Sequence, residues 1–337
     1  MKTQLKTALM KKMLTAKKKK EPFHEKLSEL YTLPENAPDH YNNSYYFSGH
    51  SVSGESLFLR LGLRNDHFCE VWCAYKNGDT FYANPKTLYE TGEALPLTVS
   101  CLETSKRWKV TYQGPMQDQH QPDRCVQAKL SCIFTAGAPI FDFSYHMNPT
   151  TLARAMANEK WSKSFFAELK ENSQTHYEQP GDMTGTLMLG EREIPIALHT
   201  VRDHSFGKRD WDYMNKHYWL MALMENGDML NVSMVSYPAM HQLDAGNVVI
   251  NGKAISLVQV IPHGDLIQEG KGPDHLHMTC VLENGRKLNL YAKKEGEIVY
   301  PLGNGYVLRE GLGTFSVDGR KARGIMEFGF HHDWTRW

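Results

Sequence analysis

The 337-residue sequence has few of the features that place a chain in a membrane or outside the cell. No apolar run approaches the roughly 20 residues that a membrane-spanning helix needs. Lysines interrupt the apolar residues at the N-terminus too often for a secretory signal. Only six cysteines occur, and none forms a C-x-x-C pair, which argues against a zinc knuckle or a dithiol redox motif. We therefore expect buried free thiols and a cytoplasmic location.

Motifs for the common cofactor-dependent and hydrolytic reactions are also missing. The chain has no G-x-S-x-G elbow, no G-x-x-x-x-G-K-[ST] phosphate loop and no H-E-x-x-H metal motif. Gly303-Asn304-Gly305 is too short to cradle a dinucleotide and is interpreted as a turn. His275 and His277 would share a strand face, but no third ligand follows at a suitable spacing. We expect no cofactor and no bound metal.

The chain as a whole has no net charge, but positive charge is concentrated at its start. The 38 basic and 38 acidic residues balance, so composition gives no hint of a nucleic-acid partner. Residues 1–20 nevertheless hold eight lysines and no acid, which leaves the rest of the chain at −8. We interpret residues 1–25 as a solvated, poorly ordered basic tail. The alternatives are a weak targeting peptide and an amphipathic helix in weak contact with a membrane surface through Lys2–Lys20.

The sequence does contain many short strand-like segments. From about residue 44, runs rich in aromatic and aliphatic residues alternate with dipeptides of Asn or Asp followed by Gly. These dipeptides tolerate the positive φ angles of a type I′ hairpin turn, and they favour antiparallel hairpins over β-α-β units. The five are Asn77-Gly78, Asn226-Gly227, Asn251-Gly252, Asn284-Gly285 and Asp318-Gly319.

A helix is predicted over residues 151–172, near the middle of the chain and after the start signal Pro149-Thr150. The length of the chain suits two domains, each large enough to bury its own core. We therefore expect a mostly β protein of two similar antiparallel halves that are joined near this helix. The expected division is a tail over 1–25, an N-terminal half with the linking helix over 26–172, and a C-terminal half over 173–337.

The densest group of polar residues runs from Arg202 to Trp211, within the predicted C-terminal half. Side chains alternate in an extended chain, so Arg202 and His204 would share one face of a strand and Asp203 the other. His204 is the best single candidate for acid–base work, because the pKa of histidine lies near neutrality. Two interpretations stay open: a salt-bridged corner that fixes the fold, and a ligand-facing or catalytic group.

A second candidate is Glu327, an acid in the otherwise apolar strand predicted over residues 324–330. It would share a strand face with Ile325 and Gly329. Its carboxylate could point into a cavity, or it could meet an arginine such as Arg209.

Two motifs resemble a known superfamily. They are the run His176-Tyr177-Glu178-Gln179-Pro180-Gly181 and, after a short strand pair, Arg202-Asp203-His204-Ser205-Phe206-Gly207-x-Arg209-Asp210-Trp211. Together they resemble the two-domain lipocalin-like proteins that include hydroxyneurosporene synthase, a carotenoid hydratase, and the AttH-type proteins; Phe206 stands where Trp is common. The stretch from Tyr46 to Gly62 and Glu70-Val71-Trp72 also resembles the accessory domain of invertebrate phosphoenolpyruvate-synthase-like proteins.

The resemblance implies two lipocalin-like β-barrels and an apolar pocket for a small molecule. It implies a cofactor-independent hydratase, cyclase or isomerase that acts on a hydrophobic, terpenoid- or polyene-like compound. The residues expected to do the chemistry are His204, Asp210 and Glu327. Those expected to bind the substrate are Arg202, Arg209, Trp211, Tyr218 and Trp219. The alternatives are a non-catalytic carrier of a lipid or pigment, and a regulatory interaction module.

Overall fold

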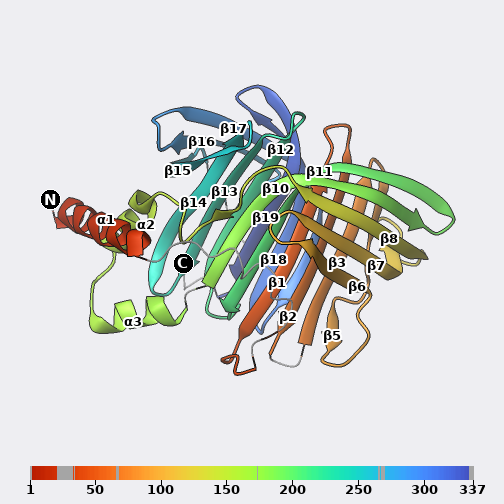
Figure 1. Cartoon of the computed structure of the whole chain (residues 1–337), viewed down its shortest axis with the longest axis horizontal. Helices are drawn as coiled ribbons and strands as arrows, with labels where there is room; N and C mark the ends of the chain where they lie inside the picture. The colour runs from red at the N-terminus through yellow and green to blue at the C-terminus, as the bar shows by residue number, and fades with distance from the viewer. Residues whose placement is uncertain are drawn as a thin grey trace. The chain divides into compact units, whose positions relative to one another are not determined.

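The computed structural model describes residues 2–20, 33, 35–65, 68–172, 174–264, 266 and 270–333. Over these residues it contains nineteen strands and three helices, and they form two separate compact units (Figure 1). One unit comprises residues 24–140 and 174–209, and the other comprises residues 1–23, 141–173 and 210–337. The predicted mostly β architecture of two antiparallel barrels is confirmed.

The N-terminal barrel closes because its last two strands pair with each other. Its strand order is β11-β1-β2-β3-β4-β7-β8-β10, and the additional pairing of β10 with β11 completes a ring of eight among the described strands. All eight of these pairings are antiparallel, as expected from the hairpin signals. The bounds are β1 (Tyr41–His50), β2 (Glu55–Arg64), β3 (Phe68–Asn77), β4 (Thr80–Ala83), β7 (Arg107–Asp118), β8 (Cys125–Ala136), β10 (Gln174–Leu189) and β11 (Arg192–Lys208). Three short strands complete the first half of the chain: β5 (Leu88–Glu90), β6 (Leu97–Glu103) and β9 (Phe141–Asp142).

The C-terminal barrel joins consecutive strands in chain order, from β12 to β19, and closes through the pairing of β12 with β19. Alternate residues of each strand fill its interior, and among them are Leu220, Met278 and Phe328. The bounds are β12 (Lys216–Met224), β13 (Met229–Tyr237), β14 (Met240–Ile250), β15 (Lys253–Pro262), β16 (His275–Leu282), β17 (Lys287–Leu302), β18 (Tyr306–Val317) and β19 (Arg320–His331).

All five Asn-Gly or Asp-Gly dipeptides lie between paired strands, so the hairpin prediction is confirmed. Positive φ at both central residues occurs at Asn251-Gly252 and at Asp318-Gly319, which is the type I′ pattern. At the other three turns only the glycine has positive φ. Glycine is needed there because a side chain would strain that backbone conformation.

The mid-chain helix is two helices: α2 (Pro149–Asn158) and α3 (Lys163–Glu171). The single helix predicted over 151–172 was wrong in this respect. The chain breaks between them because Ser162 begins a new helix, and its hydroxyl accepts a hydrogen bond from the backbone N–H of Phe165. The side chain of Asn148 caps α2 in the same way.

The basic N-terminus forms the helix α1 (Lys2–Lys20), which corrects the expectation of a poorly ordered tail over its first twenty residues. Met10 is buried in one apolar cluster with residues of α2 and α3, and Leu14 packs against that cluster. Figure 1 shows α1 beside α2. Leu5, Leu9 and Met13 lie on another side of the helix and are exposed. The part of the predicted tail beyond residue 20 lies outside the described residues.

We expected the C-terminal half to begin at residue 173, but the structure divides the chain elsewhere. Strands β10 and β11 belong to the N-terminal barrel, and the compact unit that contains the C-terminal barrel begins its last segment at Asp210. Helices α2 and α3 group with that second unit rather than with the first. Hydrophobic pattern alone could not show this, because a strand that closes a barrel looks like any other strand in sequence.

All six cysteines are free thiols, as expected, but only three of them are buried: Cys73, Cys132 and Cys280. Cys125 is exposed, which corrects the expectation that all six are buried. None of the helices in the described part of the chain has the length and apolar character that crossing a bilayer requires.

Candidate functional site

The stretch from Arg202 to Lys208 forms the end of β11 in the N-terminal barrel, not in the C-terminal one as predicted. The predicted alternation is confirmed. Arg202 and His204 lie opposite Phe47 and Tyr45 of β1, both of which are core residues, so their side chains face the barrel interior. Asp203 points to the outer face.

His204 joins three neighbouring strands inside this barrel. Its Nδ1 lies 2.5 Å from the hydroxyl of Tyr177 on β10, and its Nε2 lies 2.7 Å from Oδ1 of Asn43 on β1. Because an amide oxygen only accepts, Nε2 carries the proton and Nδ1 accepts from the tyrosine. Burial and the positive charge of Arg202 hold the pKa of His204 well below its usual range. A neutral imidazole with both nitrogens bonded is suited to locking strands together, and this geometry favours the structural interpretation of His204.

Arg202 is fully buried beside it, with the guanidinium over the ring of Trp108 at 4.9 Å. Its Nη2 donates to Oε1 of Gln179 at 3.0 Å, and no described carboxylate forms a salt bridge with it. At Arg202, a cation–π contact therefore takes the place of the salt bridge that one interpretation predicted. Arg209, at the end of the same segment, donates to Oε1 of Gln174 and to the hydroxyl of Ser205.

A connected set of proton-transfer groups lies on the C-terminal barrel, and we call Glu327, His217 and Tyr306 the acid–base cluster. His217 Nε2 lies 2.5 Å from Oε1 of Glu327, and His217 Nδ1 lies 2.5 Å from the hydroxyl of Tyr306. All three residues are buried. The glutamate meets a histidine, and its alternative contact with an arginine such as Arg209 stays a prediction.

The strand register places this cluster on the outer face of the barrel. His217 on β12 is directly opposite Gly329 on β19, and Glu327 is two residues before that glycine on the same face. A side chain at 329 would not fit, since its Cβ would lie 2.6 Å from the Tyr306 hydroxyl and closer still to the ring of His217. Gly329 thus provides the space in which imidazole and phenol stack, with ring centroids 5.8 Å apart and planes 5° from parallel.

The loop before β12 supports Tyr306 from two sides. The ring of Trp211 stacks on Tyr306 at 5.6 Å, and the sulfur of Met214 lies 3.1 Å from its hydroxyl. The carboxylate of Asp212 accepts hydrogen bonds from the backbone N–H groups of Asn304 and Gly305. These bonds hold residues 303–305 in place. This segment is a turn, as predicted, and it leads directly into Tyr306.

The structure therefore brings together part of the predicted site. Glu327 and Trp211 meet at the acid–base cluster, and Trp219 lies directly opposite Glu327 in the β12–β19 pairing. Tyr218 points the other way, into the barrel core. Asp210 accepts a hydrogen bond from the backbone N–H of Asp212 and so shapes a turn.

His217 and Tyr306 were missed as site residues. Period-two alternation could have grouped His217 with Trp219 on one strand face, but sequence carries no signal that pairs either with residue 327 across the barrel closure. Tyr306 follows the Gly303-Asn304-Gly305 turn, and only the register of β18 with β19 shows that it reaches the same face.

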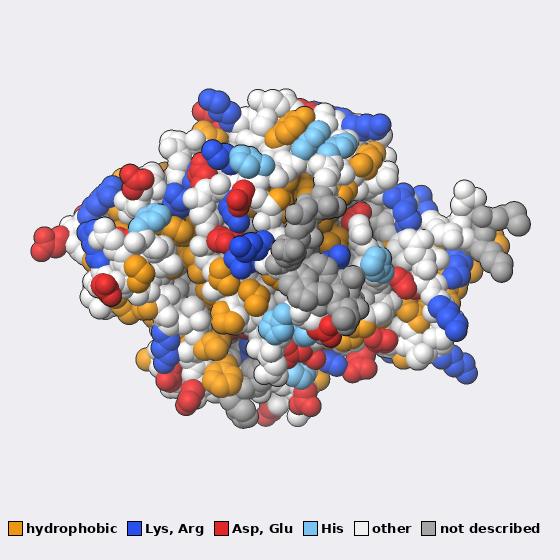
Figure 2. Space-filling model, turned by 180° about the vertical axis from the view of Figure 1, so that it is seen from behind, with side chains coloured by type: hydrophobic (Ala, Val, Ile, Leu, Met, Phe, Trp, Pro, Cys, Tyr) orange, Lys and Arg blue, Asp and Glu red, His pale blue; other side chains and the backbone are white. Residues whose placement is uncertain are grey.

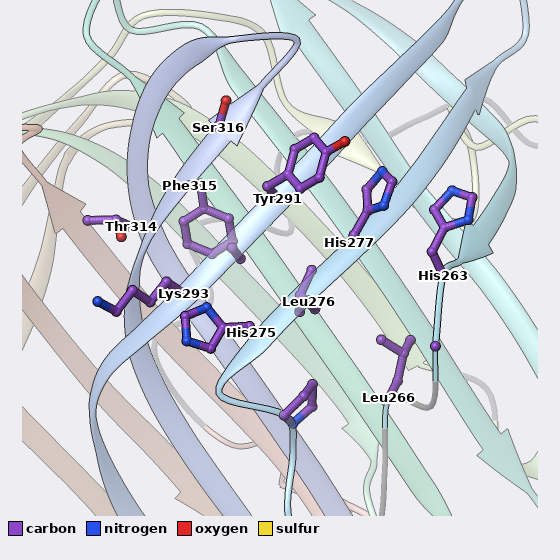
Figure 3. Close-up of a pocket in the computed structure, with 13 residues that line it drawn as sticks. His263, Leu266, His275, Leu276, His277, Tyr291, Lys293, Thr314, Phe315 and Ser316 are labelled. Atoms are coloured by element: carbon purple, nitrogen blue, oxygen red, sulfur yellow. The ribbon is translucent and has the colours of Figure 1, made fainter.

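A second feature of the C-terminal barrel is a pocket of about 570 Å³ beside β16, β17 and β18. Figure 3 shows the rings of His263, His277 and Tyr291 in a row, and their successive centroids are 4.2 and 4.1 Å apart. Leu276, Ala292 and Phe315 supply apolar lining, and Lys293 supplies a charge. Elsewhere the surface is mixed: on the face shown in Figure 2, basic, acidic and hydrophobic side chains are interspersed.

The comparisons with known proteins agree with this architecture. Residues 29–332 match the family described as a domain of unknown function, DUF7064. The chain belongs to that family. No curated protein matches the sequence.

Three solved structures share the two-barrel, lipocalin-like fold with this family member. An AttH-like protein of Nitrosomonas europaea is 13% identical with a TM-score of 0.59, over 89% of this chain and 98% of its own. Kievitone hydratase from Nectria haematococca is 11% identical with a TM-score of 0.53, over 90% and 93%. CghA, solved with Sch210972, is 9% identical with a TM-score of 0.53, over 87% and 88%. At such identities the likeness shows the fold alone.

Proposed function

We propose that this protein is a cofactor-independent enzyme that uses general acid–base catalysis on a hydrophobic small molecule. The observation that carries the proposal is the acid–base cluster, in which a carboxylate, an imidazole and a phenol are joined by two consecutive hydrogen bonds of 2.5 Å. Groups of this kind, within hydrogen-bond reach of one another, are what proton transfer requires.

The order of the three groups sets the direction of proton movement. A carboxylate accepts hydrogen bonds, so Glu327 fixes the proton of His217 on Nε2 and leaves Nδ1 to accept from Tyr306. When a proton moves from the Tyr306 hydroxyl to Nδ1, the imidazolium that forms lies against the negative charge of Glu327 and is stabilised by it. The cluster can therefore take up a proton at the Tyr306 oxygen and return it there.

Addition of water to a carbon–carbon double bond would use both directions. The Tyr306 oxygen takes a proton from a water molecule as its own proton passes to Nδ1 of His217, the water oxygen bonds to one alkene carbon, and the proton then returns through the Tyr306 oxygen to the other carbon. The double bond is lost, one C–H and one C–O bond form, and nothing is oxidised or reduced. Isomerisation uses the same groups, with a proton added at one carbon and removed from another.

The surroundings of the cluster favour an apolar substrate. Trp211 and Met214 contact Tyr306, and Trp219 lies beside Glu327, so aromatic and sulfur-containing side chains border the polar groups. The fold shared with kievitone hydratase, whose name describes the addition of water, supports a catalytic role and makes a hydratase the first reaction to test.

The test is product analysis in isotopically labelled water. An apolar extract of source cells is incubated with the wild-type protein and with Glu327→Gln, in water labelled with heavy oxygen and in deuterium oxide, and products are resolved by mass spectrometry. A hydratase adds heavy oxygen and deuterium to the same product, whereas an isomerase or cyclase adds deuterium at most. Products that form equally with Glu327→Gln, or no product at all, would contradict the proposal.

A second candidate function, that of a carrier, is favoured by the pocket beside β16–β18. Its volume of about 570 Å³ lies within the usual range for small-molecule sites, and Leu276 and Phe315 supply apolar lining. A carrier predicts that native mass spectrometry of protein from its source detects an unmodified apolar ligand, and that Ala292→Trp, which fills the pocket, removes it. Labelled products in the preceding experiment would contradict a purely carrier role.

A further inference from the structure

A mixed group of metal-ligating side chains lies on the outer face of the N-terminal barrel, in the motifs that the proposed function does not use. His176 and Glu178 are two residues apart on β10 and therefore share a strand face. Asp203 on β11 is directly opposite Glu178, so its side chain lies on the same face. All three belong to one compact unit and to one antiparallel strand pair.

The three side chains converge on one point. One ligand atom from each, an imidazole nitrogen and two carboxylate oxygens, all lie within 4.8 Å of one another. Nε2 of His176 is hydrogen-bonded to Oδ2 of Asp203 and lies 3.7 Å from Oε1 of Glu178. Within the part of the chain that the structure describes, no other set of three such residues meets this spacing.

A bound cation would reduce the repulsion between the two carboxylates of this group. Two carboxylates directly opposite each other on neighbouring strands repel, and here Glu178 is fully buried and Asp203 nearly so. Arg209 donates to Gln174 and Ser205 on this side of the strands. The imidazole of His176, about one third exposed at 33%, leaves a route from solvent to the group.

We propose that His176, Glu178 and Asp203 bind one divalent transition-metal ion, with Mn²⁺ or Zn²⁺ as the matching chemistry. Two carboxylates and one imidazole suit these ions, and three protein ligands leave coordination positions for water or a further ligand. The metal takes the place of the proton between His176 and Asp203. This site lies in the N-terminal barrel, so the test of metal binding is independent of the test of the acid–base cluster in the other barrel.

The same two strands offer a matched control. His199 on β11 lies directly opposite Asp182 on β10, and its Nδ1 is 2.7 Å from the carboxylate, but this exposed pair is not joined by a second carboxylate in any described three-residue group. The His199–Asp182 pair therefore reproduces the histidine–aspartate contact of the proposed site but has no counterpart of Glu178.

The experiment titrates chelator-treated full-length protein with Mn²⁺ and follows the free-ion signal by electron paramagnetic resonance, with Zn²⁺ measured by calorimetry. We expect one ion per chain for the wild type and for His199→Gln. Glu178→Gln and Asp203→Asn keep the side-chain shape but remove charge, and each should weaken binding by about tenfold or more, since even indirect partners of a metal contribute that much. Wild-type protein that binds no ion stoichiometrically, or variants that bind as the wild type does, would overturn the proposal.

A measurement on the wild type alone covers the case in which the variants fail to fold. Paramagnetic Mn²⁺ at substoichiometric concentration should broaden the imidazole NMR signals of His176 more strongly than those of His199. Equal broadening of both histidines would identify nonspecific surface binding and contradict the site.

Discussion

Gly329→Ala tests the acid–base cluster without changing any of its functional groups. The added Cβ would lie 2.6 Å from the Tyr306 hydroxyl and nearer still to the ring of His217, whereas atoms in ordinary contact are about 3.5–4.0 Å apart. One or both rings must therefore move by about 1 Å, and a displacement of about 1 Å in an active site can cost on the order of a hundredfold in rate. Overpacking of this kind also costs about 1–3 kcal/mol of stability.

The assay compares the rate of product formation with the melting temperature for three proteins: wild type, Gly329→Ala and Ile325→Val. Ile325 is buried on the same face of β19, and its truncation lowers stability by about 0.5–1.5 kcal/mol without placing an atom near His217. We expect Gly329→Ala to lose about a hundredfold in kcat and Ile325→Val to lose little. If both variants lose activity only in proportion to their stability, the cluster is structural and the reasoning is refuted.

Three further predictions concern other parts of the chain. Burial raises the pKa of Asp244 above its usual value, so the native state holds that proton more tightly than the unfolded state and ionisation costs stability. Asp244→Asn should therefore raise the free energy of unfolding in urea at neutral pH, and a gain that persists in acid, where the carboxyl is protonated, would contradict this cause. Burial raises the pKa of the Cys280 thiol to about 12. Iodoacetamide should therefore label exposed Cys125 first in the native protein and Cys280 only after unfolding. Peptide mapping by mass spectrometry that finds the reverse order would be inconsistent with the fold. Helix α1, with its exposed leucines and eight lysines, should co-sediment weakly with anionic vesicles at low salt and be released at high salt, and absence of binding at low salt would end the membrane-surface proposal.

The fold was predictable from the sequence because its signals are local. Each Asn-Gly or Asp-Gly dipeptide determines its own hairpin, and alternation along β11 correctly separated Arg202 and His204 from Asp203. The boundary between barrels was not predictable in this way. It depends on which distant strand pairs with β11, and β1 lies some 150 positions earlier in the chain.

The candidate site was also only partly predictable, because it depends on pairing between strands that are distant in the sequence. Glu327 was found because an acid in an apolar strand stands out, and Trp211 because it ends a dense polar motif. Their meeting point is created by the closure of β12 against β19 and by the space above Gly329, neither of which has a sequence signature. The motif that drew attention first, around His204, forms interior hydrogen bonds that hold three strands of a barrel together.

The measurement that tests the central claim most directly is the rate of product formation by His217→Gln, with His241→Gln as its control. His241 is an exposed histidine on β14 of the same barrel, away from the outer-face register of Glu327 and Tyr306. If the acid–base cluster does the chemistry, His217→Gln loses about a hundredfold or more in rate at an unchanged melting temperature, and His241→Gln keeps the wild-type rate. If a folded His217→Gln protein turns over substrate as fast as the wild type, the cluster does not catalyse the reaction.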